Sequence, residues 1–151
     1  MQALKFNNQF TLELPGDPSD SPAERLISNA LFARVAPKKP ASPYLIHYSP
    51  EVAAEIGLDV SECAGKDFVD LFSGSKIMPG MDPHATCYGG HQFGNWAGQL
   101  GDGRAINLGE IDTEKGDLML QLKGAGPTPF SRNADGFAVL RSSLREYLCS
   151  E

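Results

Sequence analysis

The stretch CYGGHQFGNWAGQLGDGRAINLGE, from Cys87 to Glu110, carries the strongest structural signals in this sequence. Seven of its 24 residues are glycine, yet apolar and aromatic residues run through it, which is not the composition of a flexible linker. Within it, FGNWAGQL and RAINLGEI flank Gly101-Asp102-Gly103, which predicts a β-hairpin with its turn at these three residues. Such glycines have two explanations: tight turns, or a loop whose backbone amides approach the phosphates of a nucleotide.

The residues that follow add a third strand and a helix. A second turn, DTEKGD, leads into LMLQLKG, where leucines alternate with other residues up to Lys123. After a loop, the chain reads as a helix that carries Glu146, with an apolar stripe beside it. A glycine-rich hairpin, a lysine at the end of the third strand and a glutamate on the next helix form the layout of a protein-kinase N-lobe. In the alternative interpretation, Lys123 ends a hairpin in solvent and Glu146 pairs with a helical neighbour such as Arg145 or Ser142.

The first 87 residues predict a mixed extension of helices and short strands. Partial alternation predicts a strand over 6–14, helical spacing predicts a helix over 23–35, and YLIHY predicts a short buried strand over 44–48. A serine cap followed by proline and glutamate at 49–51 predicts a helix that Gly57 ends, and 67–72 predicts another.

The predicted fold is therefore α+β: an extension over 1–87, and a kinase-like N-lobe core over 88–151 with an antiparallel sheet, a glycine-rich hairpin and a C-type helix. The helical pattern is still running at Glu151, without a capping glycine, so we expect the chain to be part of a longer protein, cut before the C-lobe.

Composition limits the classes of partner. The net charge is −6 and the pI is near 5.0, which argues against nucleic acid or an anionic membrane as the main partner. Three cysteines without close pairing indicate a reducing compartment. There is no signal-peptide pattern and no run of about 18 apolar residues, so we expect a cytoplasmic location.

Two other features of the glycine-rich region admit a functional reading. Asp82, His84, Cys87 and His91 could ligate a metal, but a structural zinc site needs a second cluster, which the sequence lacks, so we expect no metal site here. Tyr88, Phe93 and Trp96 could stack nucleic-acid bases. In an acidic chain with no interleaved basic residues, we expect them to be core aromatics instead.

The lettering of the second half carries a family resemblance. The segments YGGHQFGNWAGQLGDGRA and LQLKGAGPTPFSR, followed by ADG and then AVLRSSLREYL, resemble the selenoprotein O family, also called YdiU. The resemblance covers about Tyr88 to Glu151, and YSPEVAAEIGLD matches the family more loosely. Members of the family are much longer, which agrees with the unfinished helix.

The resemblance implies an atypical, pseudokinase-like fold that binds ATP in a flipped orientation. It implies transfer of AMP to the hydroxyl side chains of proteins with Mg²⁺ or Mn²⁺, and uridylylation is also ascribed to bacterial members. Carried over residue by residue, the nucleotide contacts fall on Gly101, Gly103, Arg104, Lys123 and the Asp135-Gly136 pair. The kinase-type lysine falls on Lys123 and its helix partner on Glu146.

The family's catalytic base and metal ligands have no counterpart among the matched residues, so we expect ATP and protein substrates as partners, metal ligands outside this chain, and no transfer activity from residues 1–151 alone. Two other function classes stay open. One is a non-catalytic module with structural glycine-rich hairpins that binds a protein partner. The other is an ordinary phosphotransferase.

Overall fold

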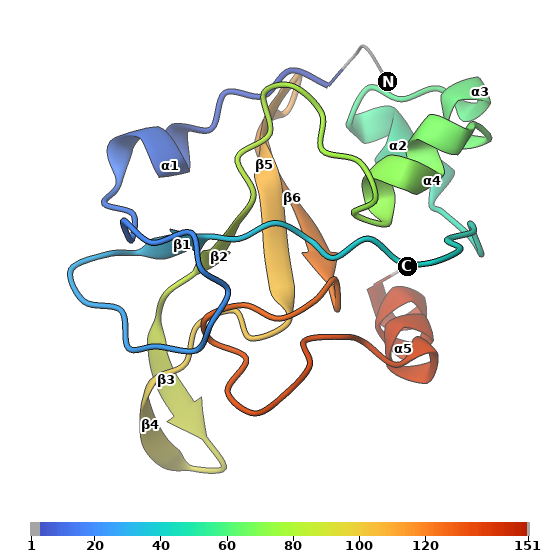
Figure 1. The fold of residues 1–151 in the computed structure, drawn as a ribbon. Helices are drawn as coiled ribbons and strands as arrows, with labels where there is room; N and C mark the ends of the chain where they lie inside the picture. The colour runs from blue at the N-terminus through green and yellow to red at the C-terminus, as the bar shows by residue number, and fades with distance from the viewer. Residues whose placement is uncertain (1–3, 151) are drawn as a thin grey trace.

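The computed structural model describes residues 4–150; residues 1–3 and 151, at the outer ends of the two predicted regions, lie outside this part. A four-stranded antiparallel sheet in the order β1-β2-β5-β6 forms the centre, and a separate two-stranded sheet, β3-β4, projects from it (Figure 1). The strands are β1 (Phe32–Arg34), β2 (His84–Thr86), β3 (Gly89–Gln92), β4 (Asn95–Gln99), β5 (Ala105–Thr113) and β6 (Gly116–Lys123). The helices are α1 (Gln9–Glu13), α2 (Pro50–Glu55), α3 (Val60–Cys63), α4 (Lys66–Phe72) and α5 (Leu140–Ser150). The α+β class with antiparallel pairing is confirmed.

The β5–β6 hairpin is the centre of the larger sheet. Its strands pair from Ala105 opposite Lys123 to Thr113 opposite Gly116, so the turn predicted at DTEKGD is confirmed. Alternation places Leu118, Leu120 and Leu122 on one face of β6. Leu120 and Leu122 are buried in the main apolar cluster, and Leu118 packs against it.

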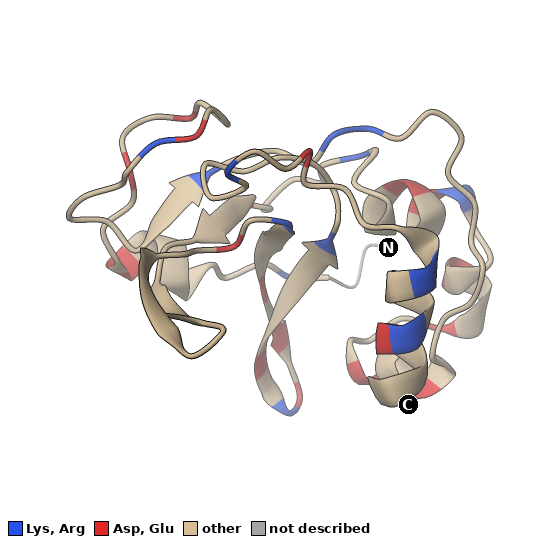
Figure 2. Ribbon diagram, turned by 90° about the horizontal axis from the view of Figure 1, so that it is seen from below, with Lys and Arg blue, Asp and Glu red and all other residues tan. Residues whose placement is uncertain are grey.

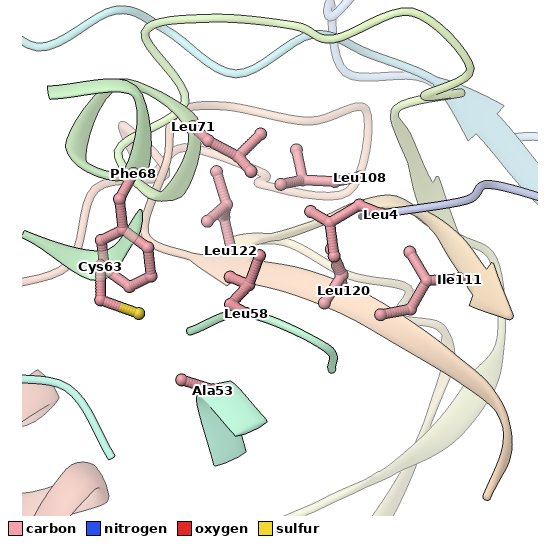
Figure 3. Packing of buried hydrophobic residues seen from close by; sticks show 10 residues of the cluster. All are labelled: Leu4, Ala53, Leu58, Cys63, Phe68, Leu71, Leu108, Ile111, Leu120 and Leu122. Atoms are coloured by element: carbon pink, nitrogen blue, oxygen red, sulfur yellow. The ribbon is translucent and has the colours of Figure 1, made fainter. Parts of the chain in front are cut away.

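Helices α2, α3 and α4 cover that face (Figure 3). Ser49 caps α2 by accepting a hydrogen bond from the Val52 amide, and Pro50 occupies the first turn, as the sequence predicts. Gly57, with φ of +80°, follows its end. Helix α4 contributes Phe68 and Leu71 to the cluster, which confirms the second predicted helix.

Three predictions in the N-terminal region are wrong. The expected strand over 6–14 contains helix α1, because Glu110 accepts a hydrogen bond from the Phe10 amide and Phe10 stacks on the His84 ring. The expected helix over 23–35 is wrong: the chain is irregular up to residue 31 and then forms β1, which pairs with β2. Arg25 binds Asp17 and the carbonyls of 19, 21 and 23, and these contacts hold the irregular conformation.

The expected buried strand over 44–48 is also wrong. This segment has no regular structure, and Tyr44 and Ile46 are exposed. Only Tyr48 at its end turns inward, against Phe68 of α4. The apolar letters of this segment therefore do not mark a strand of the sheet.

The predicted division at residue 87 stays a prediction. The four-stranded sheet draws β1 and β2 from the first region and β5 and β6 from the second. All the elements expected for the core, namely the β3–β4 hairpin, the β5–β6 hairpin and α5, lie in the second region.

Candidate functional site

Lys123 and Glu146 form an ion pair at the end of the larger sheet. The Lys123 Nζ lies 2.8 Å from a Glu146 carboxylate oxygen, and both side chains are about half exposed. Lys123 is the last residue of β6, and Glu146 lies on α5. Figure 2 shows that the helix at the C-terminus carries both basic and acidic positions and that basic positions lie where the neighbouring strands end. The Lys123 ammonium, which donates a hydrogen bond to the Glu146 carboxylate, lowers the pKa of that carboxyl. The two residues are thus paired with each other, as the kinase-like layout requires, although both side chains remain partly exposed to solvent.

Arg104 lies at the same end of the sheet. It immediately precedes β5, and its carbonyl accepts a hydrogen bond from the Gly124 amide at 2.6 Å, which sets it beside the residue after Lys123. Its positive charge also contributes to the lowered pKa of Glu146. Two cations, Lys123 and Arg104, therefore stand near a single carboxylate, in a protein of negative net charge.

The loop of Gly101, Asp102 and Gly103 is not the turn of a hairpin between β4 and β5, so this prediction is wrong. Strand β4 pairs with β3, whereas β5 pairs with β2 and β6. The amide protons of Gly101 and Gly103 are donated to the carbonyls of Tyr88 and Gly101, and the Asp102 amide is donated to Thr86. These three donors are already engaged within the chain.

The conformation of this loop is explained by packing. Gly101 has φ of +71°, and a Cβ there would stand 2.3 Å from the Phe130 ring. A Cβ on Gly103 would stand 2.9 Å from the Phe130 carbonyl oxygen. At Gly101 only glycine allows both the positive φ and the close approach to the ring, and at Gly103 only glycine allows the close approach to the carbonyl. The loop thus fixes where β5 begins, and with it the place of Arg104.

Sequence reasoning missed the residues that hold this loop. Asp102 accepts a hydrogen bond from the Thr86 amide at 2.9 Å, and its carbonyl accepts one from the Thr128 hydroxyl at 2.6 Å. The Ser131 hydroxyl donates to the Gly103 carbonyl. Thr128 and Ser131 are buried polar residues. The pattern TPFS, with two hydroxyl residues around a proline, was the available signal for a turn that binds backbone.

Asp135 and Gly136 lie in the segment that leads into α5. The Asp135 carboxylate accepts a hydrogen bond from the Phe137 amide. Gly136 has φ of +74°, and a Cβ there would stand 2.1 Å from the Gly126 carbonyl oxygen. In the same way, a Cβ on Gly124 would stand 2.1 Å from the Cβ of Ala138.

These close approaches bring together the segment that follows Lys123 and the segment that precedes α5, the helix of Glu146. The backbone bridge Ala125–Phe137 pairs the segment after Lys123 with the segment before α5. The glycines around this bridge therefore bring the helix that carries Glu146 back to the strand that carries Lys123.

The tip of the glycine-rich hairpin lies at Phe93-Gly94, because Gln92 pairs with Asn95. Both tip residues have positive φ, 52° and 82°, the combination of a two-residue type I′ turn. The expectation that the aromatics here are core residues is wrong: Phe93 is fully exposed, Trp96 is 64% exposed, and Tyr88 is 47% exposed. His91 contacts the Trp96 ring edge-on.

The residues of the alternative metal site are not gathered. Across residues 4–150 the structure contains no group of three or more His, Cys, Asp or Glu side chains that could hold a metal ion. His84 is buried between the Phe10 and Phe32 rings, and its Nδ1 lies 2.8 Å from the Asp82 carbonyl oxygen. Burial lowers the pKa of His84, although Asp82 acts in the opposite direction. Cys87 is half-buried against the second apolar cluster, and all three cysteines are free.

A hollow of about 660 Å³ borders Lys123. It lies where β6 ends, between the end of α4 and the start of α5. Its lining includes Gln121, Leu122 and Lys123 from β6, together with Leu140 and Ser143 from the first turn of α5. The ion pair therefore stands at the border of a space large enough for part of a small molecule.

Comparison with known proteins gives a consistent result. The family model described as protein adenylyltransferase SelO matches residues 20–151. The chain is 58% identical to the protein nucleotidyltransferase YdiU of Aromatoleum aromaticum over 156 residues, which covers 100% of the chain and 30% of that relative. It is 57% identical to the protein of the same name from Azoarcus sp. (strain BH72) and 56% identical to that of Flavobacterium johnsoniae, covering 29% of each. The chain thus spans about 30% of the length of these curated relatives.

Proposed function

The chain belongs to the SelO family of protein adenylyltransferases, and from that premise we propose that it supplies the nucleotide-binding half of a protein nucleotidyltransferase active site. The whole enzyme binds ATP in a flipped orientation and transfers AMP to Ser, Thr or Tyr hydroxyls of proteins, or UMP from UTP. The observation that carries the proposal is the Lys123–Glu146 ion pair with Arg104 beside it.

Lys123 and Arg104 have the chemistry that a nucleoside triphosphate requires. Transfer of a nucleotidyl group is mostly positioning and neutralisation of charge around an in-line displacement. The acceptor hydroxyl oxygen bonds to the α-phosphorus, and the bond from that phosphorus to the bridging oxygen breaks, releasing pyrophosphate. Lys123, held in place by Glu146, binds phosphate oxygens as a point charge, and the Arg104 guanidinium can bind two at once.

The glycines and Asp135 act by shaping the site. Because the amides of Gly101 and Gly103 are engaged within the chain, their contribution is to place Arg104 through contact with Phe130. Gly136 brings α5 to the strand, and Asp135 caps the turn before it. Gly101 and Gly103, and likewise Asp135 and Gly136, thus border the nucleotide. They shape the site, and the backbone amides of Gly101 and Gly103 stay bonded within the chain.

A divalent cation, Mg²⁺ or Mn²⁺, neutralises the triphosphate in such chemistry. The described residues bring no three metal-ligating side chains together, and the cations Lys123 and Arg104 fit phosphate rather than metal. We propose that the metal ligands, and the base that accepts the hydroxyl proton, come from the part of the full-length protein outside this chain. It follows that residues 1–151 alone bind nucleotide weakly and transfer nothing.

The partners in this proposal are ATP and hydroxyl-bearing proteins in the cytoplasm, with no nucleic acid or membrane. No helix among the described residues is long and apolar enough to span a bilayer.

The test compares labels on the full-length protein. Transfer from α-³²P-ATP to a protein acceptor supports nucleotidyl transfer, whereas label transferred only from γ-³²P-ATP indicates a phosphotransferase. A second candidate, a non-catalytic module that binds a protein partner, is favoured by one observation: packing against Phe130 explains Gly101 and Gly103 without any ligand. Absence of transfer from both labels, together with absence of nucleotide binding, would support the module.

A further inference from the structure

Helix α5 carries Glu146 but is only lightly attached to the rest of the protein. None of its described residues is buried, and Leu140, Leu144 and Leu148 of the expected apolar stripe are exposed. Within the described part of α5, Ser142 and Tyr147 are partly buried, and the other residues are exposed. The position of Glu146 therefore depends on a small number of contacts.

Tyr147, next to Glu146 in the chain, makes the contact that reaches furthest. Its hydroxyl oxygen lies 2.6 Å from the Nδ1 of His47. The two rings also meet edge to face, with centroids 5.5 Å apart. His47 lies in the irregular segment before α2, far from α5 in the sequence.

The contact continues into the apolar core. His47 is followed by Tyr48, whose ring packs edge to face on Phe68 at 5.7 Å, and Phe68 packs on Phe72 at 4.6 Å. Tyr147 lines a mainly apolar groove of about 340 Å³ together with Tyr48, Val52, Phe68 and Phe72. Aromatic contacts of this kind add to the stability gained from burial. Tyr147 thus connects the exposed helix to buried residues of α4.

We propose that Tyr147 and His47 are positioning residues for the nucleotide site: their contact holds α5 in the place where Glu146 pairs with Lys123. The N-terminal end of the helix is fixed by the Ala125–Phe137 bridge, and Tyr147 fixes the C-terminal half. Since Glu146 lies between these two attachments, loss of the second one lets the carboxylate move from the lysine. The role in nucleotide binding rests on the function proposed above; the attachment of the helix does not.

The first test measures amide hydrogen exchange over 140–150 in the full-length protein. Tyr147→Phe keeps the ring and removes the hydroxyl, and His47→Phe removes the ring nitrogen that the hydroxyl contacts. Tyr44→Phe is the matched control, because that hydroxyl is on a 77% exposed side chain. We expect exchange in α5 to become about three- to tenfold faster in the two variants and to stay unchanged in the control. Unchanged exchange in Tyr147→Phe would overturn the inference.

The second test asks whether the pair acts through Glu146. Binding of ATP with Mn²⁺ is measured for Tyr147→Phe in the wild-type and Glu146→Gln backgrounds. We expect about two- to fivefold weaker binding in the first background and no further loss in the second. Equal losses in both backgrounds would show a merely structural role and overturn the positioning proposal. If the wild-type protein binds no nucleotide, the proposed function fails, and the exchange experiment still decides whether the pair holds the helix.

Discussion

Gly101 lies against the ring of Phe130 so closely that a methyl group on Gly101 would stand 2.3 Å from the ring Cγ. This relationship separates two reasons for a glycine that look the same in a sequence. One is access of a ligand to the backbone, and the other is access of the protein's own core. At Gly101 the close contact with Phe130 shows that the glycine is needed for packing of the protein's own core. This packing in turn sets the position of Arg104, three residues later.

We expect Gly101→Ala to lower the free energy of unfolding by about 2–4 kcal/mol without nucleotide, because of the positive φ and overpacking against Phe130. Gly94→Ala is the control, because φ there is +82° but nothing lies within 4 Å of the added Cβ. It should cost only about 1 kcal/mol. Urea unfolding of each variant measures the difference, and equal losses would contradict the packing explanation.

Lys123→Ala should weaken the binding of ATP by about tenfold or more, because a charge-assisted contact to phosphate is lost. Saturating ATP stabilises a binding protein by about 2.7 kcal/mol at one hundred times the dissociation constant. The nucleotide-dependent rise in melting temperature should therefore shrink in this variant. Lys115→Ala, which removes a lysine paired with Glu55 at the far end of the β5–β6 hairpin, should keep the full rise. An equal rise in Lys123→Ala and wild type would remove Lys123 from the site.

The Lys123–Glu146 pair should lose its stabilising effect in acid. The pKa of the Glu146 carboxyl in the folded protein lies below its ordinary value of 4.5. The stabilisation by Glu146 is therefore fully present above pH 4.5 and is lost as the pH falls through the lower pKa of the folded state. The difference in unfolding free energy between wild type and Glu146→Gln should therefore exist at pH 7 and close below pH 4.5. Glu13→Gln, on α1, serves as the control. A difference that does not change with pH would contradict the pairing.

His84 should make the protein less stable as the pH falls below 6.5. Burial lowers the folded pKa from 6.5, so the unfolded chain takes up a proton that the folded chain resists. The effect can reach about 1.4 kcal/mol per pH unit. Replacing the ring by His84→Gln should flatten the dependence that the wild-type protein shows between pH 6.5 and 5. Calorimetric unfolding across this range measures both slopes.

Phe93→Asn should leave stability unchanged or raise it by about 0.5–1 kcal/mol. The side chain is fully exposed and φ is +52°, a conformation that asparagine adopts more easily than phenylalanine before a glycine. If nucleotidyl transfer by the full-length protein falls while stability does not, Phe93 contributes to function. A large loss of stability would show instead that the ring is needed for folding.

The sequence predicted best where the pattern was local. Alternation up to Lys123, the turn before β6 and the cap at Ser49 each depend on neighbouring residues, and each is confirmed. The Lys123–Glu146 pairing was also reached, because strand and helix are joined by one loop.

The errors depended on distant residues. The segment over 23–35 has helical spacing but is not helical, because Arg25 binds Asp17 and Phe32 pairs with Thr86. The hairpin turn was placed at Gly101–Gly103 because those residues have ideal turn lettering, whereas the real tip uses Phe93, which rarely adopts positive φ. The contact of Gly101 with Phe130 is a tertiary contact that no local pattern contains.

The close approach of Gly136 to Gly126, and of Gly124 to Ala138, has a consequence for anyone who redesigns this protein. The separation of a lysine and a glutamate is usually altered by changing one of the charges. Here it can be altered by a single uncharged methyl group, placed on a glycine of the segment that connects the two residues. Alanine at 124 or 136 would leave every charge in place and still move the helix, so a survey restricted to charged residues would overlook the positions that control the pair.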